Sequence, residues 1–271
     1  YSQRQVVMPA DLEALRSNLQ GLQRVLVAFS GGADSSFLAW VANDTLGPEA
    51  VHCFTAVSPS LAKSELEDCA SLAQEWGLTW TSVETAEMDN AAYRANDSDR
   101  CYHCKSALMD VVEPVAEENE LVVVLGVNTD DLGDHRPGQS AAEERHARFP
   151  LVEAGFSKKE VREHSKKLGL RTWDKPAAAC LASRIPYGTQ VSVPLLRRLD
   201  RAESALRDLG FHQLRVRDYG EVARLELDLN QLPMALDRRI EIVEAVQSVG
   251  YQYVTLDLEG FRSGNLNQSI Q

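Results

Sequence analysis

Residues 24–36 read RVLVAFSGGADSS, a short apolar run followed at once by two glycines. The apolar part, 25–29, predicts a buried strand, and the stretch 36–46 predicts the helix that follows it. Two glycines at such a junction let the backbone bend and approach an anion, toward which the first N–H groups of the helix point. The stretch therefore predicts a strand–loop–helix unit that binds phosphate.

The loop also indicates which phosphate it binds. The string S-G-G-x-D-S is the PP-loop signature of ATPases that adenylate a carboxyl or carbonyl oxygen and release pyrophosphate. The residues expected to hold ATP are Ser30, Gly31, Gly32, Asp34 and Ser35. Of these, Asp34 suits a Mg²⁺ on the phosphates better than the phosphates themselves. The alternative is an ordinary β–α turn capped by Asp or Ser.

A second segment, GVNTDD at 126–131, follows the apolar run 121–126. Gly126 would allow close approach, and Asp131 could reach the nucleotide or its metal. We therefore add both to the predicted ATP site, with a solvated loop as the alternative for the two aspartates.

Strand-like and helix-like stretches alternate through the first half of the chain, which predicts an α/β fold of the PP-loop ATPase type, a parallel sheet flanked by helices. The expected strands are 25–29, 51–57, 79–83 and 121–126, and the expected helices include 61–76 and 105–118. A long irregular stretch, 127–150, follows. Later stretches predict a smaller α+β module, with helices at 194–209 and 235–249 and strands at 214–220, 222–229 and 253–258. We expect an ATP-binding adenylation domain over 1–188 and a substrate-binding and oligomerisation domain over 189–271.

The charge distribution limits the kind of partner. The net charge is −12, with 10 Lys+Arg and 24 Asp+Glu in residues 1–150, and 18 and 16 in residues 151–271. A large nucleic-acid footprint normally shows as a basic face, so a small anionic substrate fits this chain better. The chain has no run of eighteen apolar residues, so we expect no membrane span. Five cysteines without a secretion signal indicate a reducing, cytoplasmic compartment, with Cys53 and Cys69 as core thiols.

Three other cysteines are candidates for chemistry. Cys101 and Cys104 form a C-x-x-C pair, which by itself fits a zinc site, a redox dithiol or an iron–sulfur ligand pair. His103 or His135 could complete a mixed zinc site. Cys180, in the small-residue stretch AAACLASR, is the third thiol that a [4Fe–4S] cluster with one open iron would need.

Five segments together resemble the LarE family, the ATP-dependent sulfur transferases of nickel-pincer nucleotide biosynthesis. They are SGGADSS, GVNTDDLGDHRPG, FPLVEAGFSKKEVREHSKKLGL, KPAAACLASRIPYG and RVRDYGEVARLEL. The likeness extends from about residue 20 to 265. The first segment is shared with many PP-loop enzymes, whereas the last two are more specific.

The resemblance implies a substrate and a reaction. The substrate would be pyridinium-3,5-biscarboxylic acid mononucleotide, whose carboxylates are adenylated with ATP and Mg²⁺ and then converted to thiocarboxylates. A lactate-racemase-like enzyme would use the finished nickel cofactor. The resemblance also implies a homo-oligomer, with a hexamer as one candidate state, and no nucleic-acid or membrane partner.

The family divides by its source of sulfur. Members with only the cysteine that matches Cys180 give up its sulfur and end as dehydroalanine. Members that also carry a C-x-x-C resemble iron–sulfur tRNA thiolases and pass on sulfur from an external sulfide or persulfide donor. Cys101, Cys104 and Cys180 assign this chain to the second group, with a [4Fe–4S] cluster on the three thiols. Cys180 and Asp34 are the expected catalytic residues. Sacrificial use of Cys180 is the alternative.

The resemblance also carries a substrate site. The matching residues are Ser183, Arg184, Glu203, Arg215 and Arg217. Guanidinium groups bind phosphate and carboxylate in a bidentate way, which suits the two strand arginines to this substrate. The alternative for Arg215 and Arg217 is one face of a solvated strand. Two other functions stay open, a PP-loop tRNA thiolase and a non-catalytic iron–sulfur or nucleotide carrier.

Overall fold

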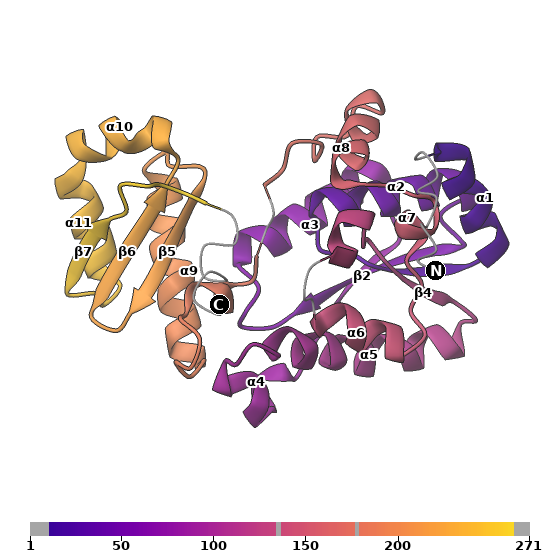
Figure 1. Cartoon of the computed structure of the whole chain (residues 1–271), viewed down its shortest axis with the longest axis horizontal. Helices are drawn as coiled ribbons and strands as arrows, with labels where there is room; N and C mark the ends of the chain where they lie inside the picture. The colour runs from indigo at the N-terminus through magenta and orange to yellow at the C-terminus, as the bar shows by residue number, and fades with distance from the viewer. Residues whose placement is uncertain (1–10, 134–136, 177–178, 263–271) are drawn as a thin grey trace, which may run out of the picture. The chain divides into compact units, whose positions relative to one another are not determined.

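The computed structural model describes residues 11–133, 137–176 and 179–262. They form two compact units (Figure 1). The first comprises the described residues within Tyr1–Val57, Glu65–Glu87 and Cys101–Ala177, and the second those within Ser58–Ser64, Met88–Arg100 and Ala178–Gln271. The units do not coincide with the expected division at residue 188, because two short segments of the N-terminal half belong to the second unit. The separate roles assigned to the two domains stay predictions.

The first unit is built on a four-stranded parallel sheet in the order β3-β2-β1-β4. Its strands are β1 (Val25–Ala28), β2 (Val51–Val57), β3 (Trp80–Glu84) and β4 (Val122–Leu125). The sheet confirms the predicted fold class. All four carboxyl ends share one edge, at which the ligand sites of such sheets form.

Helices cover both faces of this sheet (Figure 1). On one face Val25 and Val27 join a buried cluster with residues of α1 (Leu12–Leu22), α2 (Ala33–Leu46), α3 (Lys63–Trp76) and α8 (Lys158–Lys167). On the other face Leu26 packs with residues of α5 (Arg100–Glu118) and α6 (Pro137–Glu144). Successive strand side chains point to opposite faces, so β1 is buried on both sides.

Several elements differ from the expected ones. The helix α5 begins at Arg100, not at 105, so the C-x-x-C pair lies inside its first two turns. The stretch 127–150 is not irregular throughout, because it contains the 3-10 helix η2 (Thr129–Gly133), α6 and the start of α7 (Pro150–Glu153). Two further short helices, η1 (Glu87–Asp89) and α4 (Ala91–Ala95), precede α5.

The second unit is built on a three-stranded sheet in the order β5-β6-β7. Strands β5 (Leu214–Tyr219) and β6 (Val222–Leu227) are antiparallel, and β7 (Tyr253–Leu256) runs parallel to β6. The apolar stripe of α9 (Val193–Asp208) is buried, and the expected helix at 235–249 is divided at Arg238 into α10 (Leu232–Asp237) and α11 (Arg239–Ser248). Two short 3-10 helices, η3 (Leu181–Arg184) and η4 (Leu229–Gln231), complete it. In the described part of the chain, no helix is long and apolar enough to cross a membrane.

Candidate active site

The glycine loop joins β1 to α2 as the sequence predicts. Gly31 has φ +67°, the left-handed region that favours glycine, and Gly32 is the N-cap of α2. The hydroxyl groups of Ser30 and Ser35 lie 3.0 Å apart across the loop, and the backbone N–H of Ser30 donates to Ser35 Oγ. The start of a 14-residue helix with this geometry can bind an anion, as ATP requires. Ser36 is fully buried and faces the core.

Gly126 follows β4 and lies against the first turn of α2. A Cβ at this position would meet Ser35 N at 2.7 Å, Ser35 Cα at 2.8 Å and the carbonyl carbon of Asp34 at 2.9 Å. The close approach that the sequence suggested is therefore an approach to the backbone of α2. A direct contact between Gly126 and a nucleotide stays a prediction.

Two carboxylates come together beside the loop. Burial and the neighbouring Asp131 carboxylate raise the pKa of Asp34 above its ordinary value, while Lys158 and Arg162 oppose the shift. Asp131 is itself buried, and its Oδ1 lies 2.9 Å from Lys158 Nζ. Its neighbour Asp130 accepts a hydrogen bond from the backbone N–H of Lys158. Mg²⁺ bound to substrate phosphates prefers one or two carboxylates, so the residues here fit such an ion.

The C-x-x-C pair lies in the first two turns of α5, with Cys101 exposed and Cys104 half-buried. Side chains three apart on a helix share a face, so both thiols can reach one ligand. A Cβ at Gly138 of α6 would come within 3.0 Å of the Cys101 carbonyl oxygen, so α6 packs directly on this turn. Among the described residues, no group of three or more His, Cys, Asp and Glu side chains could hold a metal ion. This applies to Cys101 and Cys104 with His103 and equally to the two cysteines with Cys180, whereas His135 lies outside the described residues.

The third thiol lies in the second unit, where Cys180 is half-buried and precedes η3. Arg184 at the end of η3 donates to the carbonyl oxygens of Ala179 and Cys180 and to Ser183 Oγ. Its other guanidinium nitrogens bind both carboxylate oxygens of Glu203, at 2.8 and 3.1 Å. Arg184 thus fixes the backbone around the cysteine.

Glu203 is the buried centre of this arrangement. It is fully enclosed, and besides Arg184 it accepts hydrogen bonds from Arg207 and from the backbone N–H of Val216 in β5. The structure therefore shows Glu203 as a side chain that connects α9, η3 and β5. Direct contact between Glu203 and a substrate stays a prediction.

The two strand arginines point into the second unit and not into solvent. Arg217 is 1% exposed, donates to the Ser183 carbonyl oxygen and pairs with Glu226 at 2.8 Å. Arg215 is 5% exposed and lies over the ring of Phe261. Burial, together with the nearby charges of Arg184 and Arg217, lowers the pKa of Arg215 to about 10. An anion would stabilise the charged form of a buried arginine that lies close to other cations.

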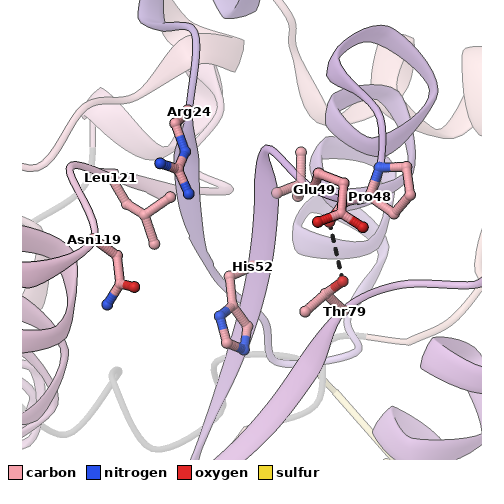
Figure 2. A pocket seen from close by; sticks show the side chains of 8 residues that line it. Arg24, Pro48, Glu49, His52, Thr79, Asn119 and Leu121 are labelled. Carbon is pink, nitrogen blue, oxygen red and sulfur yellow. Dashed lines mark hydrogen bonds between the residues drawn. The ribbon is translucent and has the colours of Figure 1, made fainter.

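A small hollow lies at the other edge of the parallel sheet, and Figure 2 shows it. It encloses about 110 Å³, and Arg24, Val51, Thr79 and Leu121 line it at the amino ends of the four strands. Thr79 Oγ1 closes one side by donating to the Pro48 carbonyl oxygen (Figure 2). The hollow is therefore separate from the glycine loop, which follows the carboxyl end of β1.

Sequence reasoning missed some residues of these sites. Glu226 and Arg224 alternate with apolar residues on β6, and in the register of the hairpin they face Arg215 and Arg217. Glu226 lies opposite Arg215, and this pair of opposite charges was the available signal, whereas Arg224 lies opposite Arg217 and carries the same charge. Lys158 gave no such signal, because only the folded chain brings α8 to Asp131.

Comparisons with known proteins find relatives that match almost the whole chain. A family model described as NAD synthase matches residues 12–119, which include the glycine loop. An uncharacterized protein of Synechocystis is 49% identical over 267 residues, covering 97% of this chain and 99% of the relative. The pyridinium-3,5-bisthiocarboxylic acid mononucleotide synthase of Lactiplantibacillus plantarum is 37% identical over 253 residues, which cover 93% of this chain and 92% of the relative. An uncharacterized protein of Methanocaldococcus jannaschii is 27% identical over 242 residues, covering 89% and 92%.

Proposed function

This chain belongs to the LarE family of ATP-using sulfur transferases, and we propose that it converts pyridinium-3,5-biscarboxylic acid mononucleotide to its thiocarboxylate product. The observation that carries the proposal is the likeness to the L. plantarum synthase over nearly the whole of both chains. The glycine loop with its two carboxylates and the buried arginines around η3 support it, since the reaction needs a site for ATP and a site for an anionic substrate.

The chain's own residues suit the steps of such a reaction. Ser30, Ser35 and the amino end of α2 would bind the phosphates, and Asp34 and Asp131 would hold Mg²⁺, which neutralises charge on them. A substrate carboxylate oxygen then attacks the α-phosphorus, and pyrophosphate leaves with the electron pair of the broken bond. Sulfur next displaces AMP from the acyl carbon.

The substrate would be held by Arg215 and Arg217, with Ser183 and Arg184 at the loop that carries Cys180. Support comes from the guanidinium of Arg215. Burial and the nearby cations lower its pKa, and a bound anion would raise the pKa again. Glu203 would act by holding Arg184 in place.

For the sulfur source we propose a [4Fe–4S] cluster on Cys101, Cys104 and Cys180, loaded by a sulfide donor or by a persulfide donor together with a two-electron reductant. The first two thiols share one helix face, and Cys180 is half-buried just before η3. A cluster held by three thiols keeps one iron open for an added sulfide. Sacrifice of the Cys180 sulfur is the competing route.

The test is an ATP–pyrophosphate exchange assay with the pyridinium biscarboxylate mononucleotide, followed by mass spectrometry of substrate and protein. We expect exchange that depends on the substrate and a product in which sulfur replaces carboxylate oxygen. Absence of exchange would point to a carrier and refute the proposal. Conversion of Cys180 to dehydroalanine after turnover would instead refute only the cluster as sulfur source.

We also propose that the chain forms a homo-oligomer, with a hexamer as one candidate state. The proposal rests on the family resemblance; Leu236 and Ile240, on α10 and α11, are 60% and 62% exposed and are apolar side chains that such an interface could cover. Light scattering after size-exclusion chromatography measures the mass directly. A monomer at all concentrations would contradict the proposal.

A further inference from the structure

Lys175 lies beside the glycine loop, although no predicted role includes it. A Cβ built on Gly31 would lie 3.7 Å from Lys175 Nζ, so the ammonium borders the loop at its left-handed residue. The chain at this point has no regular structure: Lys175 follows a turn, and its N–H donates to the Thr172 carbonyl oxygen. Arg162 of α8 holds the same residue by donating to its carbonyl oxygen at 2.9 Å.

Two hydrogen bonds also fix the side chain of Lys175. Lys175 Nζ donates to Glu65 Oε2 at 2.8 Å and to Asp68 Oδ2 at 2.6 Å, both on α3. The side chain is only 18% exposed, and the two carboxylates are 26% and 24% exposed. Burial alone would lower the pKa of Lys175, but the hydrogen bonds and charges of Asp68 and Glu65 outweigh it and raise the pKa. Lys175 is therefore a cation at neutral pH.

An ammonium group has three N–H donors, and Glu65 and Asp68 use two of them. We propose that Lys175 is a catalytic residue of the adenylation step, which donates its third N–H to the pyrophosphate part of ATP bound at the glycine loop. This inference rests on the proposed function. Glu65 and Asp68 act as positioning residues, because they fix the ammonium at the loop before the nucleotide arrives.

The role follows from where charge develops. When the substrate carboxylate oxygen bonds to the α-phosphorus, the bond from that phosphorus to the oxygen bridging to the β-phosphorus breaks. Its electron pair stays on the departing pyrophosphate, which gains negative charge. A preorganised cation beside that oxygen stabilises the transition state more than the bound ATP.

The first test is isothermal titration of inorganic pyrophosphate with Mg²⁺ into the full chain. We expect Lys175→Met to weaken binding about 10- to 100-fold, the factor that follows from losing one hydrogen bond to a charged group. Lys175→Arg should restore most of the binding, because it keeps a cationic donor. Lys167→Met is the matched control, since Lys167 is exposed at the end of α8 and its loss should change nothing.

Lys175→Met leaves Glu65 without its cation, so the double variant Glu65→Gln/Lys175→Met accompanies it. We expect the double variant to bind pyrophosphate as weakly as the single one and to lose ATP–pyrophosphate exchange. Wild-type affinity and exchange in both variants would overturn the role of Lys175 and leave the proposed function intact. If the wild-type chain neither bound pyrophosphate nor catalysed exchange, the proposed function would fail, and this role with it.

Discussion

Replacing Gly126 by alanine tests whether β4 positions the nucleotide loop. The new Cβ would lie 2.7–2.9 Å from three backbone atoms of Asp34 and Ser35. Backbone atoms cannot rotate away, so either the first turn of α2 or the end of β4 must shift. Overpacking a well-packed site typically costs about 1–3 kcal/mol, and rigid backbone neighbours place this substitution near the upper value. For a chain of this size, a cost of about 3 kcal/mol lowers the Tm by roughly 6–12 °C.

The shift should also weaken ATP binding, because the displaced turn carries the N–H groups that face the phosphates. Thermal unfolding and isothermal titration of ATP measure the two effects. Gly21→Ala is the matched control: Gly21 lies in α1 with no atom within 4 Å of its added Cβ, so we expect equal or slightly higher stability. A Gly126→Ala variant with wild-type Tm and ATP affinity would show that β4 does not constrain the loop.

Two further predictions concern buried charges. Glu203→Gln removes the carboxylate that binds Arg184 in a bidentate way. It should lower the free energy of unfolding by about 3–5 kcal/mol in urea titrations, because a buried ion pair is broken. The exposed pair of Glu241 and Arg238 is the comparison, for which Glu241→Gln should cost at most about 1 kcal/mol; equal losses would contradict the reasoning. Asp34→Asn should raise the free energy of unfolding more at pH 7 than at pH 3. The pKa of Asp34 is raised in the folded chain, so ionising it costs stability as pH rises through the ordinary aspartate range, and asparagine has no such cost; a gain that does not depend on pH would contradict this.

The parallel sheet and the glycine loop were predictable because their signals are local. β1 is an uninterrupted apolar run, and the glycines follow it directly, so periodicity and turn chemistry gave the same answer. The sequence predicts the start of this helix at residue 105, which is too late, because the residues before the C-x-x-C pair are polar and acidic. The structure instead begins α5 at Arg100, which is buried and donates to Asn96 and to the carbonyl oxygen of Ala182.

The remaining features depend on contacts between residues far apart in the chain. Lys175 is 110 residues from Glu65, and the ion pair between them exists only once α3 and α8 are folded around the loop. The ion pair of Arg217 with Glu226 is diagonal across a hairpin, so it depends on the register that the apolar pattern and the turn set together. Motifs could therefore identify the type of site. Which charged side chains pair within the site could be seen only in the folded chain.

The assignment of thiols to an iron–sulfur cluster can be tested by comparing cysteines of different burial. Burial, together with Cys69, raises the pKa of the Cys53 thiol to about 12, so Cys53 stays protonated in the core. Only a thiolate ligates iron, and Cys101 is exposed in the first turn of α5. Cys101→Ala should therefore abolish the visible absorbance and bound iron of anaerobically reconstituted protein, whereas Cys53→Ala should keep both.

If the cluster is held by three thiols, Cys180→Ala should abolish the visible absorbance and the bound iron as Cys101→Ala does. Each of the three ligands is then needed to hold the cluster. Iron content, determined alongside the absorbance spectrum, separates loss of the cluster from loss of colour alone. Equal iron in the wild-type, Cys101→Ala and Cys180→Ala proteins would exclude these thiols as ligands. Together with dehydroalanine at Cys180 after turnover, that result would assign the transferred sulfur to the protein chain itself.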